Sequence, residues 1–431
     1  MLGRLRKVAA VCFMLASAAI PQDLAPEVIL LSRIKRHLRE ELARTPNYTC
    51  LETISRFRHD PKSPLQSHKG LARLDTVRLE IVYTDRREWY GSPGAKSMSV
   101  DNPIAFIGGG MIGNGAFAMS MHNILEGGTF TYSGEEIVDG RPAAKYNFRL
   151  PRRLKPLEIS MAGARGTVGE EGAIWVDPQS LDLIRVDSAA VEIPLYLPLH
   201  AADMSVDYAR MRISGSDVLL AQRADSSTLD TEGVESYNRM EFTHCRSYSA
   251  TSEISFDAKP DDSGGAAPNR PAPAAPVAAI PAFLKATLLL TTPVSDKDAV
   301  GALIEGKILG NLVHRGKVAV PDGSLVHGRI RRLEHYPDRG VFVVGLEFTD
   351  VVVSGESLPF YADLLRINRD PRIQPTLDHQ IFVNRAGAMR LTQESITLPE
   401  LPGVASFFVK GANFTLPSGF RMIWRTRGII H

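Results

Sequence analysis

The stretch Ala258–Pro281 reads AKPDDSGGAAPNRPAPAAPVAAIP and divides the chain into two parts. It is rich in proline, alanine and glycine, and it holds no aromatic residue and almost no bulky apolar one. Such a segment buries too little apolar surface to offset the entropy of ordering it, so it is typical of a semi-extended linker. The linker predicts a longer unit at 24–257, a shorter one at 282–431, and a variable orientation between them.

The bulk composition is that of a globular protein. The chain has 431 residues, of which 44% are hydrophobic and 23% charged, so it is long enough for two or three domains with real cores. The formal net charge is +2, and residues 1–18 contribute three positive charges and no acid, so the remainder carries −1. A near-neutral chain has no overall electrostatic reason to bind nucleic acid, and we predict no nucleic-acid partner.

The first 18 residues are typical of a secretory signal peptide. Three basic residues precede Val8–Ala16, a short apolar core, and Ala16-Ser17-Ala18 fits a small-x-small cleavage site. The core is too short to span a bilayer stably, and no later stretch is apolar enough to span one. We therefore expect a periplasmic or secreted protein that is not integral to a membrane. An uncleaved N-terminal anchor is the alternative.

Two cysteines, Cys50 and Cys245, follow the expected cleavage site and stand near the two ends of the first unit. Export would place them in a compartment where disulfides form and persist. We predict that they pair, and closing a loop of roughly 200 residues would stabilise the fold by about 4–5 kcal/mol in the loop-entropy model. Two buried free thiols are the alternative.

The first unit begins with one helix and continues in strands. Apolar residues recur at spacings of three and four through Leu24–Arg44, which predicts an amphipathic helix. Strand-like runs follow, and several are joined by turn signals. Thr129–Val138 and Arg141–Leu150, for example, flank Asp139-Gly140, a strong hairpin signal. Many antiparallel strands with short turns predict a strongly curved sheet or open barrel packed on the leading helix.

One stretch, Pro103–Leu125, breaks the strand pattern. It is apolar and rich in glycine and methionine, and it predicts a loop over 108–115 followed by a short helix over 116–125. Flexible apolar segments with methionine suit a lid over a lipophilic cavity. An ordinary core helix behind a loop is the alternative. Six residues of this stretch are the candidate ligand-binding residues: Phe106, Ile107, Met111, Ile112, Phe117 and Met121.

The first unit resembles periplasmic lipoprotein carriers of the LolA/LolB type and the related N-terminal domain of RseB-type sigma-factor regulators. The likeness is carried by the leading helix, Asn47–Cys50, Gly134–Ala143 and Gly172–Pro178, and a strand at Leu183–Val186 follows the last of these. The resemblance implies a curved sheet and lid helices that enclose a hydrophobic cavity for acyl chains. It therefore implies a lipid or a lipidated protein as the partner.

The second unit shows little helical periodicity and many strand-like runs, which predicts a small, compact β-barrel. Val318–Arg329 reads VAVPDGSLVHGR, in which Pro321-Asp322-Gly323 is a turn signal. This stretch, with Gly301–Leu312 before it, resembles the C-terminal β-barrel of VirB10/TrbI proteins, which are components of type IV secretion channels. The resemblance implies a shared barrel fold, and we expect an envelope protein as the partner of this unit.

No catalytic or metal-binding motif emerges from the sequence. The eleven histidines form no HExxH motif and no zinc-type cluster with cysteine, and there is no GxSxG motif. The glycines at 108–113 lack a βαβ context, so no nucleotide cofactor is predicted. The adjacent acids Glu135/Glu136 and Glu170/Glu171 are expected to be solvated turn residues and not a glycosidase pair, because neighbours on one strand point to opposite faces.

The sequence therefore predicts a mainly β, exported, non-enzymatic protein, with an α+β first unit and neither cofactor nor metal. In the leading hypothesis, the first unit binds a lipophilic ligand or a lipidated partner under the lid. In the alternative, both cores are filled and the chain is a structural or adaptor protein of an envelope or secretion complex. A hydrolytic enzyme is the third class, and it requires convergent polar groups in a cleft.

Overall fold

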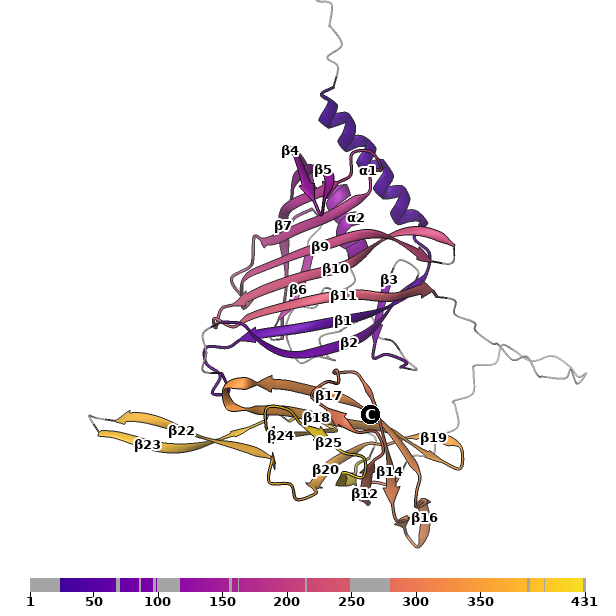
Figure 1. The fold of residues 1–431 in the computed structure, drawn as a ribbon, viewed down its shortest axis with the longest axis vertical. Helices are drawn as coiled ribbons and strands as arrows, with labels where there is room; N and C mark the ends of the chain where they lie inside the picture. The colour runs from indigo at the N-terminus through magenta and orange to yellow at the C-terminus, as the bar shows by residue number, and fades with distance from the viewer. Residues whose placement is uncertain are drawn as a thin grey trace, which may run out of the picture.

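The structure is a computed structural model, and it describes residues 24–66, 70–84, 87–95, 98, 117–154, 157–161, 163–213, 215–248, 280–385, 388–398 and 400–428. The expected signal peptide at 1–18, the linker up to residue 279 and the loop at 103–116 lie outside the described residues. The described chain is mainly strands, as expected, and it forms two large sheets, one above the other in Figure 1.

The first unit is an eleven-stranded antiparallel sheet that curls around a helical layer (Figure 1). Its helices are α1 (Pro26–Arg44) and α2 (Phe117–Gly127). Its strands are β1 (Tyr48–His59), β2 (Ala72–Thr84), β3 (Arg87–Gly91), β4 (Thr129–Val138), β5 (Arg141–Leu150), β6 (Leu157–Met161), β7 (Ala164–Val176), β8 (Leu183–Val191), β9 (Leu199–Ile213), β10 (Ser216–Asp230) and β11 (Glu235–Ser247). The order β3-β2-β1-β11-β10-β9-β8-β7-β5-β4, with β6 beside β7, places the last strand next to the first.

Local chemistry explains where these elements begin and end. Pro26 stands in the first turn of α1, where its missing N–H costs nothing, and the helix ends just before Thr45, which precedes a proline. At the β4–β5 hairpin, Asp139 and Gly140 both have positive φ, 49° and 76°. That conformation is the one a two-residue hairpin turn needs, so the turn predicted from the sequence is confirmed.

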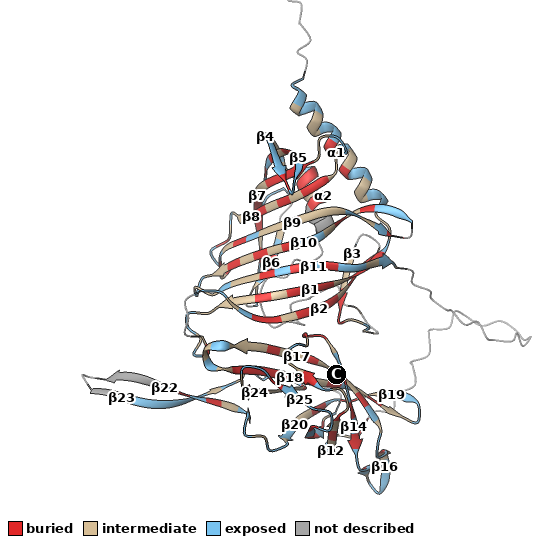
Figure 2. Cartoon of the chain, viewed as in Figure 1, coloured by how far each residue is buried: buried red, intermediate tan, exposed pale blue. Residues whose placement is uncertain are grey.

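Both helices pack on the concave side of the sheet. Ile34 and Leu38 of α1 and the apolar face of α2 share one buried cluster with residues of β5, β7 and β8. Along the strands, buried residues alternate with half-buried or exposed ones, as Figure 2 shows. The curved sheet packed on a leading helix, predicted from the sequence, is confirmed.

The disulfide predicted between Cys50 and Cys245 is also confirmed. The two cysteines lie on the neighbouring strands β1 and β11 and are separated by 195 residues in sequence. The bond therefore closes nearly the whole of the first unit.

The second unit is a nine-stranded antiparallel sheet, in agreement with the mainly β fold expected from the sequence, with three two-stranded ribbons beside it. Its elements are β12 (Lys285–Leu290), β13 (Val294–Ser295), β14 (Leu303–Leu309), β15 (Leu312–His314), β16 (Lys317–Val320), β17 (Leu325–Tyr336), the 3₁₀ turn η2 (Pro337–Arg339), β18 (Val341–Val353), β19 (Glu356–Pro359), β20 (Ala362–Ile367), β21 (Ile373–Gln374), β22 (Thr376–Arg385), β23 (Ala388–Thr397), β24 (Val404–Lys410), β25 (Thr415–Leu416) and β26 (Arg421–Thr426). The sheet order is β20-β26-β12-β14-β17-β18-β24-β21, with β19 beside β18.

The two units share one hydrophobic core. A single buried cluster contains Val77 and Leu79 of β2 together with Val300 and much of the second sheet. Val300 also forms a parallel β-bridge with Val77, in which its N–H donates to the Thr76 carbonyl at 2.8 Å and its own carbonyl accepts from the Arg78 N–H at 2.9 Å.

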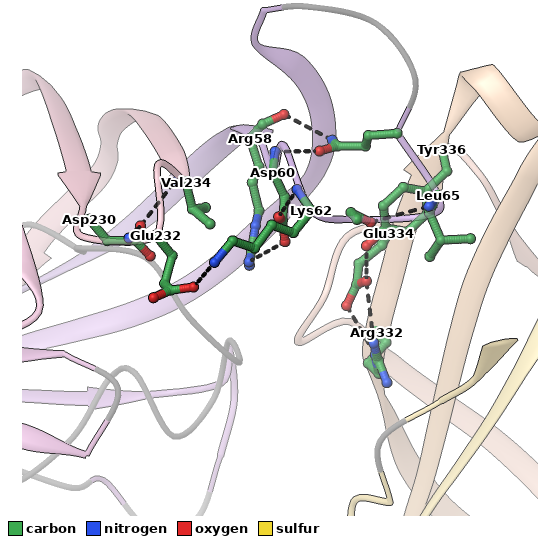
Figure 3. A network of polar contacts seen from close by, with 12 residues as sticks. Arg58, Asp60, Lys62, Leu65, Asp230, Glu232, Val234, Arg332, Glu334 and Tyr336 are labelled. Atoms are coloured by element: carbon green, nitrogen blue, oxygen red, sulfur yellow. Dashed lines mark hydrogen bonds and ion pairs between the residues drawn. The ribbon is translucent and has the colours of Figure 1, made fainter. Parts of the chain in front are cut away.

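A second contact is made by the loop that follows β1. Leu65 is buried in a cluster with Val343 and Phe408 of the second unit, and Arg339 donates a hydrogen bond to the Pro64 carbonyl at 2.9 Å. Figure 3 shows Leu65 beside Tyr336 of β17, next to the ion pair of Arg332 and Glu334. These contacts give the two units one defined orientation, in place of the variable orientation expected from the linker.

Candidate ligand-binding cavity

Alternate side chains of β1 point to the concave side of the first sheet. The buried members of this row are Tyr48, Cys50, Glu52, Ile54 and Arg56. Paired residues on neighbouring strands face the same side, so the register carries this face across the sheet. Cys50 pairs with Ile81 of β2, and Ile81 pairs with Tyr90 of β3. The concave face is therefore lined mainly by apolar and aromatic side chains, with two charged residues among them.

A cavity lies where α1 and α2 cover this face. Its volume is about 50 Å³, which is room for a small chemical group rather than for a long chain. Its wall draws on both helices and on seven strands of the sheet, and most of it is apolar. Representative wall residues are Leu38, Leu42, Met121, Leu183, Leu219 and Phe242.

Of the six candidate ligand-binding residues, two lie within the described part of the chain and four do not. Phe106, Ile107, Met111 and Ile112 lie outside the described residues. Phe117 begins α2, and Met121, one turn further along, is buried and lines the cavity. The short helix predicted at 116–125 is thus present at 117–127, and a role of these residues in ligand binding stays a prediction.

Glu88 of β3 brings a carboxyl group into the cavity wall. The Tyr90 hydroxyl donates a hydrogen bond to Glu88 Oε2 at 2.8 Å. Burial raises the pKa of Glu88 to about 7, although the hydrogen bond from Tyr90 favours the ionised form. Burial and the Glu88 charge also raise the pKa of Tyr208, whose ring lines the cavity from β9. The cavity thus holds a carboxyl group that changes its charge near neutral pH.

Glu52 of β1 is a second acid on the same face. It is fully buried, and neither carboxyl oxygen accepts a hydrogen bond from the residues that the structure describes. Burial, followed by the nearby Glu88 carboxyl, raises the pKa of Glu52 well above its usual value. A buried carboxyl without a partner is costly and is therefore a candidate functional group.

Sequence reasoning did not single out these two acids. A signal for Glu52 was present in the alternation of β1, because the residues two positions away on either side, Cys50 and Ile54, are buried apolar ones. Glu88 had no such signal, because β3 is only five residues long.

An ion-pair cluster at the rim holds α1 over the sheet. Arg210 of β9 donates to Asp182 Oδ1 at 2.6 Å and contacts Glu41 Oε2 of α1 at 3.3 Å. His37, also on α1, lies 3.1 Å from Asp182. These contacts position the helix that forms one wall of the cavity.

The acid pairs predicted to be solvated turn residues lie instead within strands. Glu136 of β4 accepts hydrogen bonds from the Trp175 indole at 2.8 Å and from Lys145 at 2.9 Å. Glu170 of β7 is 2% exposed, so the prediction that it is solvated is wrong. The reason is that β7 continues through this position, which faces the concave side between β5 and β8.

The described part of the chain offers neither a metal site nor a membrane-spanning helix. Its His, Cys, Asp and Glu side chains include no group of three or more that could hold a metal ion. Within the same residues, no helix has the length and the apolar character needed to cross a membrane.

No protein-family model matches the sequence, and no curated protein matches it significantly. Among solved structures, the chain is similar to a DUF1329 family protein from Desulfovibrio piger, with 12% identity over 52% of this chain and 95% of that one, at a TM-score of 0.29. A LolA superfamily protein from Nitrosomonas europaea is similar at 11% identity over 50% and 94% of the chains, with a TM-score of 0.26.

Another solved structure is similar over a smaller share of the chain. ComB10 of the Com type IV secretion system of Helicobacter pylori is similar at 12% identity over 34% of this chain and 85% of that one, with a TM-score of 0.19. Both resemblances stated from the sequence thus recur among solved structures. At these identities and TM-scores they concern the fold, and they assign no functional residue.

Proposed function

We propose that the chain is an exported, non-enzymatic binding protein that takes a lipophilic ligand, or the lipid of a lipidated partner, into the cavity beneath α1 and α2. The observation that carries the proposal is the apolar wall of that cavity, built jointly by both helices and the concave face of the sheet. Concave, mostly apolar sites with few polar groups are typical of small-molecule binding. The disulfide suits an oxidising compartment such as the periplasm.

The size of the cavity sets a condition on binding. A volume of about 50 Å³ accommodates one end of a ligand, so a longer chain requires α2 to move outward from the sheet. The buried apolar residues Met121, Ile124 and Leu125 hold α2 in place. A ligand that replaces their contacts with the sheet would compensate for this movement.

Mass spectrometry of organic extracts of the native protein, purified from its exported compartment, would detect the ligand. A stoichiometric lipophilic compound is the expected result. If that compound displaces an environment-sensitive dye from the cavity, the compound binds in the cavity. Ala221→Phe adds an aromatic ring to the cavity wall and should abolish binding, whereas Leu219→Ala removes a wall side chain and should retain it.

Ala43→Phe serves as the matched control, because Ala43 is exposed on α1 and the same ring is added outside the cavity. A clean extract together with dye binding that Ala221→Phe leaves unchanged would contradict the proposal. The alternative, a structural or adaptor role in an envelope complex, would then be tested by the search for a protein partner.

A further inference from the structure

The charged groups of the cavity are all of one sign. Among the described residues that line it, two are acids, Glu41 and Glu88, and none is lysine, arginine or histidine. Glu41 lies at the rim, where Arg210 neutralises it. No cation of the described chain pairs with Glu88 in this way, and its hydrogen-bond donor is the neutral hydroxyl of Tyr90.

A second acid, Glu52, lies on the same concave face, although it is not among the residues that line the cavity. Glu52 is 0% exposed, and neither of its carboxyl oxygens accepts a hydrogen bond from the described part of the chain. Its cross-strand neighbours are Leu79 of β2 and Phe242 of β11, so its surroundings on the sheet are apolar. The Glu88 charge acts on Glu52, and the Glu52 charge in turn acts on Tyr90. Buried polar groups are normally satisfied, and those that are not call for an explanation.

Aromatic rings line the same space. Tyr48 of β1, Tyr208 of β9 and Phe242 of β11 all form part of the cavity wall. The face of an aromatic ring carries partial negative charge and attracts ammonium groups, most strongly where water is excluded. Carboxyl groups and aromatic faces are therefore two independent features that favour the same kind of ligand.

An anionic head group is disfavoured in this setting. A carboxylate or phosphate entering the cavity would meet carboxyl groups with no cation to receive it. An uncharged chain would leave the Glu88 carboxyl without a positive charge beside it. An alkylammonium ion supplies N–H donors and the missing positive charge, and its hydrocarbon part matches the apolar wall.

We infer that the ligand of this cavity is a cationic amphiphile, an alkyl chain that carries an amine, with Glu88 as the counter-ion to its ammonium group and Glu52, on the same face of the sheet, as a second acid that favours the positive charge. The inference rests on the proposed function and specifies its ligand class. It requires only the ammonium end to enter the space of about 50 Å³ that the described residues leave.

The test compares three probes with the same twelve-carbon chain: dodecylamine, dodecanol and dodecanoic acid. Each displaces an environment-sensitive dye from the full, disulfide-bonded protein at neutral pH and below its micelle concentration. We expect dodecylamine to bind at least tenfold more tightly than either of the others. Glu88→Gln should remove that preference while leaving dodecanol binding within about twofold.

Glu241→Gln is the matched control, because it makes the same chemical change at an exposed position of β11 on the opposite face of the sheet. It should leave all three affinities unchanged. Glu52→Gln provides a second variant if Glu88→Gln fails to fold, and it should weaken dodecylamine alone.

Each outcome has a defined meaning. Equal or tighter binding of dodecanol or dodecanoic acid would overturn the inference and leave the proposed function intact, as would an amine preference that survives both Glu88→Gln and Glu52→Gln. The absence of binding by all three probes, with no ligand in the native extract, would overturn both. A preference for the amine that Glu88→Gln or Glu52→Gln removes, and that Glu241→Gln leaves unchanged, would support both.

Discussion

Val300 of the second unit forms a parallel β-bridge with Val77 of β2, and both side chains are fully or almost fully buried. The bridge joins β2, which is second from one edge of the first sheet, to the segment between β13 and β14 of the second unit. Because the two valines belong to the same buried cluster, the first and second units should unfold together and not as independent domains.

Gly301, the residue after Val300, allows the two backbones to approach. It has φ +94°, and a Cβ atom at this position would lie 2.6 Å from the Arg78 carbonyl oxygen, which is too close for any contact. Gly301→Ala should therefore destabilise the protein by about 2 kcal/mol or more, because it combines backbone strain with a clash. It should also split the single urea transition, followed by tryptophan fluorescence, into two.

Gly310→Ala is the control for backbone strain alone. Gly310 has a similar φ of +81°, and no atom lies within 4 Å of the added Cβ. It should cost about 1 kcal/mol and leave a single transition. Equal costs for the two variants would show that the approach of the two units at Gly301 is not tight.

The Cys50–Cys245 bond should be a major contributor to the stability of the first unit. With 195 residues between the cysteines, the loop-entropy model gives about 4–5 kcal/mol. Cys50→Ala/Cys245→Ala should lower the urea midpoint, and dithiothreitol should lower the wild-type midpoint toward the same value. Dithiothreitol should not affect the double variant. A wild-type midpoint that is insensitive to full reduction would contradict the prediction.

Local sequence signals predicted the elements of the first unit well. The β4 and β5 boundaries agree with the runs on either side of Asp139-Gly140, because a turn that requires positive φ at two positions has few compatible residues. The α1 boundaries follow from Pro26 and Pro46 in the same way. Steric restrictions of this kind act within a few residues, so the sequence displays them directly.

The candidate site and the packing of the two units depend on contacts between distant residues. Leu65 and Val300 stand in loops, where no periodicity marks them as buried. Glu52 and Glu88 come close in space only through the register of β1, β2 and β3. The composition of the linker indicates how the linker itself behaves, and it carries no information on how the two units pack against each other.

Arg56 and Asp75 form a buried ion pair on paired strands, β1 and β2. Arg56 Nε donates to Asp75 Oδ1 at 2.6 Å, and the side chains are 7% and 0% exposed. Asp75→Ala should lower the free energy of unfolding by about 3–5 kcal/mol, because it removes the carboxylate that is hydrogen-bonded to the buried guanidinium. The double variant Arg56→Met/Asp75→Leu should recover most of this loss. Urea denaturation measures both.

The exposed pair of Arg239 and Asp225 offers a comparison on the same sheet. Its atoms approach to 3.0 Å, but Arg239 is half exposed. Asp225→Ala should cost no more than about 1 kcal/mol. Costs of the same size for Asp75→Ala and Asp225→Ala would contradict the assignment of Asp75 as an obligatory buried partner.

Glu88 should make the ligand-free protein more stable in mild acid than at alkaline pH. Its pKa is raised to about 7 in the folded protein, against about 4.5 when the chain is unfolded, so between these values only the unfolded chain gives up the proton. The stabilisation is complete below pH 4.5 and is lost as the pH rises toward 7. Its size is between about 1 and 3 kcal/mol.

Glu88→Gln isolates this effect from the titrating groups that the Glu88 charge does not influence, because those groups contribute equally to both proteins. His335, whose pKa burial lowers, opposes the trend in acid, and Asp182 and Asp350, whose pKa values are lowered, lose stability only in stronger acid. The difference in the free energy of unfolding, wild type minus Glu88→Gln, should therefore fall between pH 5 and pH 7.5 in urea titrations. A difference that stays constant over this range would show that the Glu88 carboxyl ionises in the folded protein as it does in water.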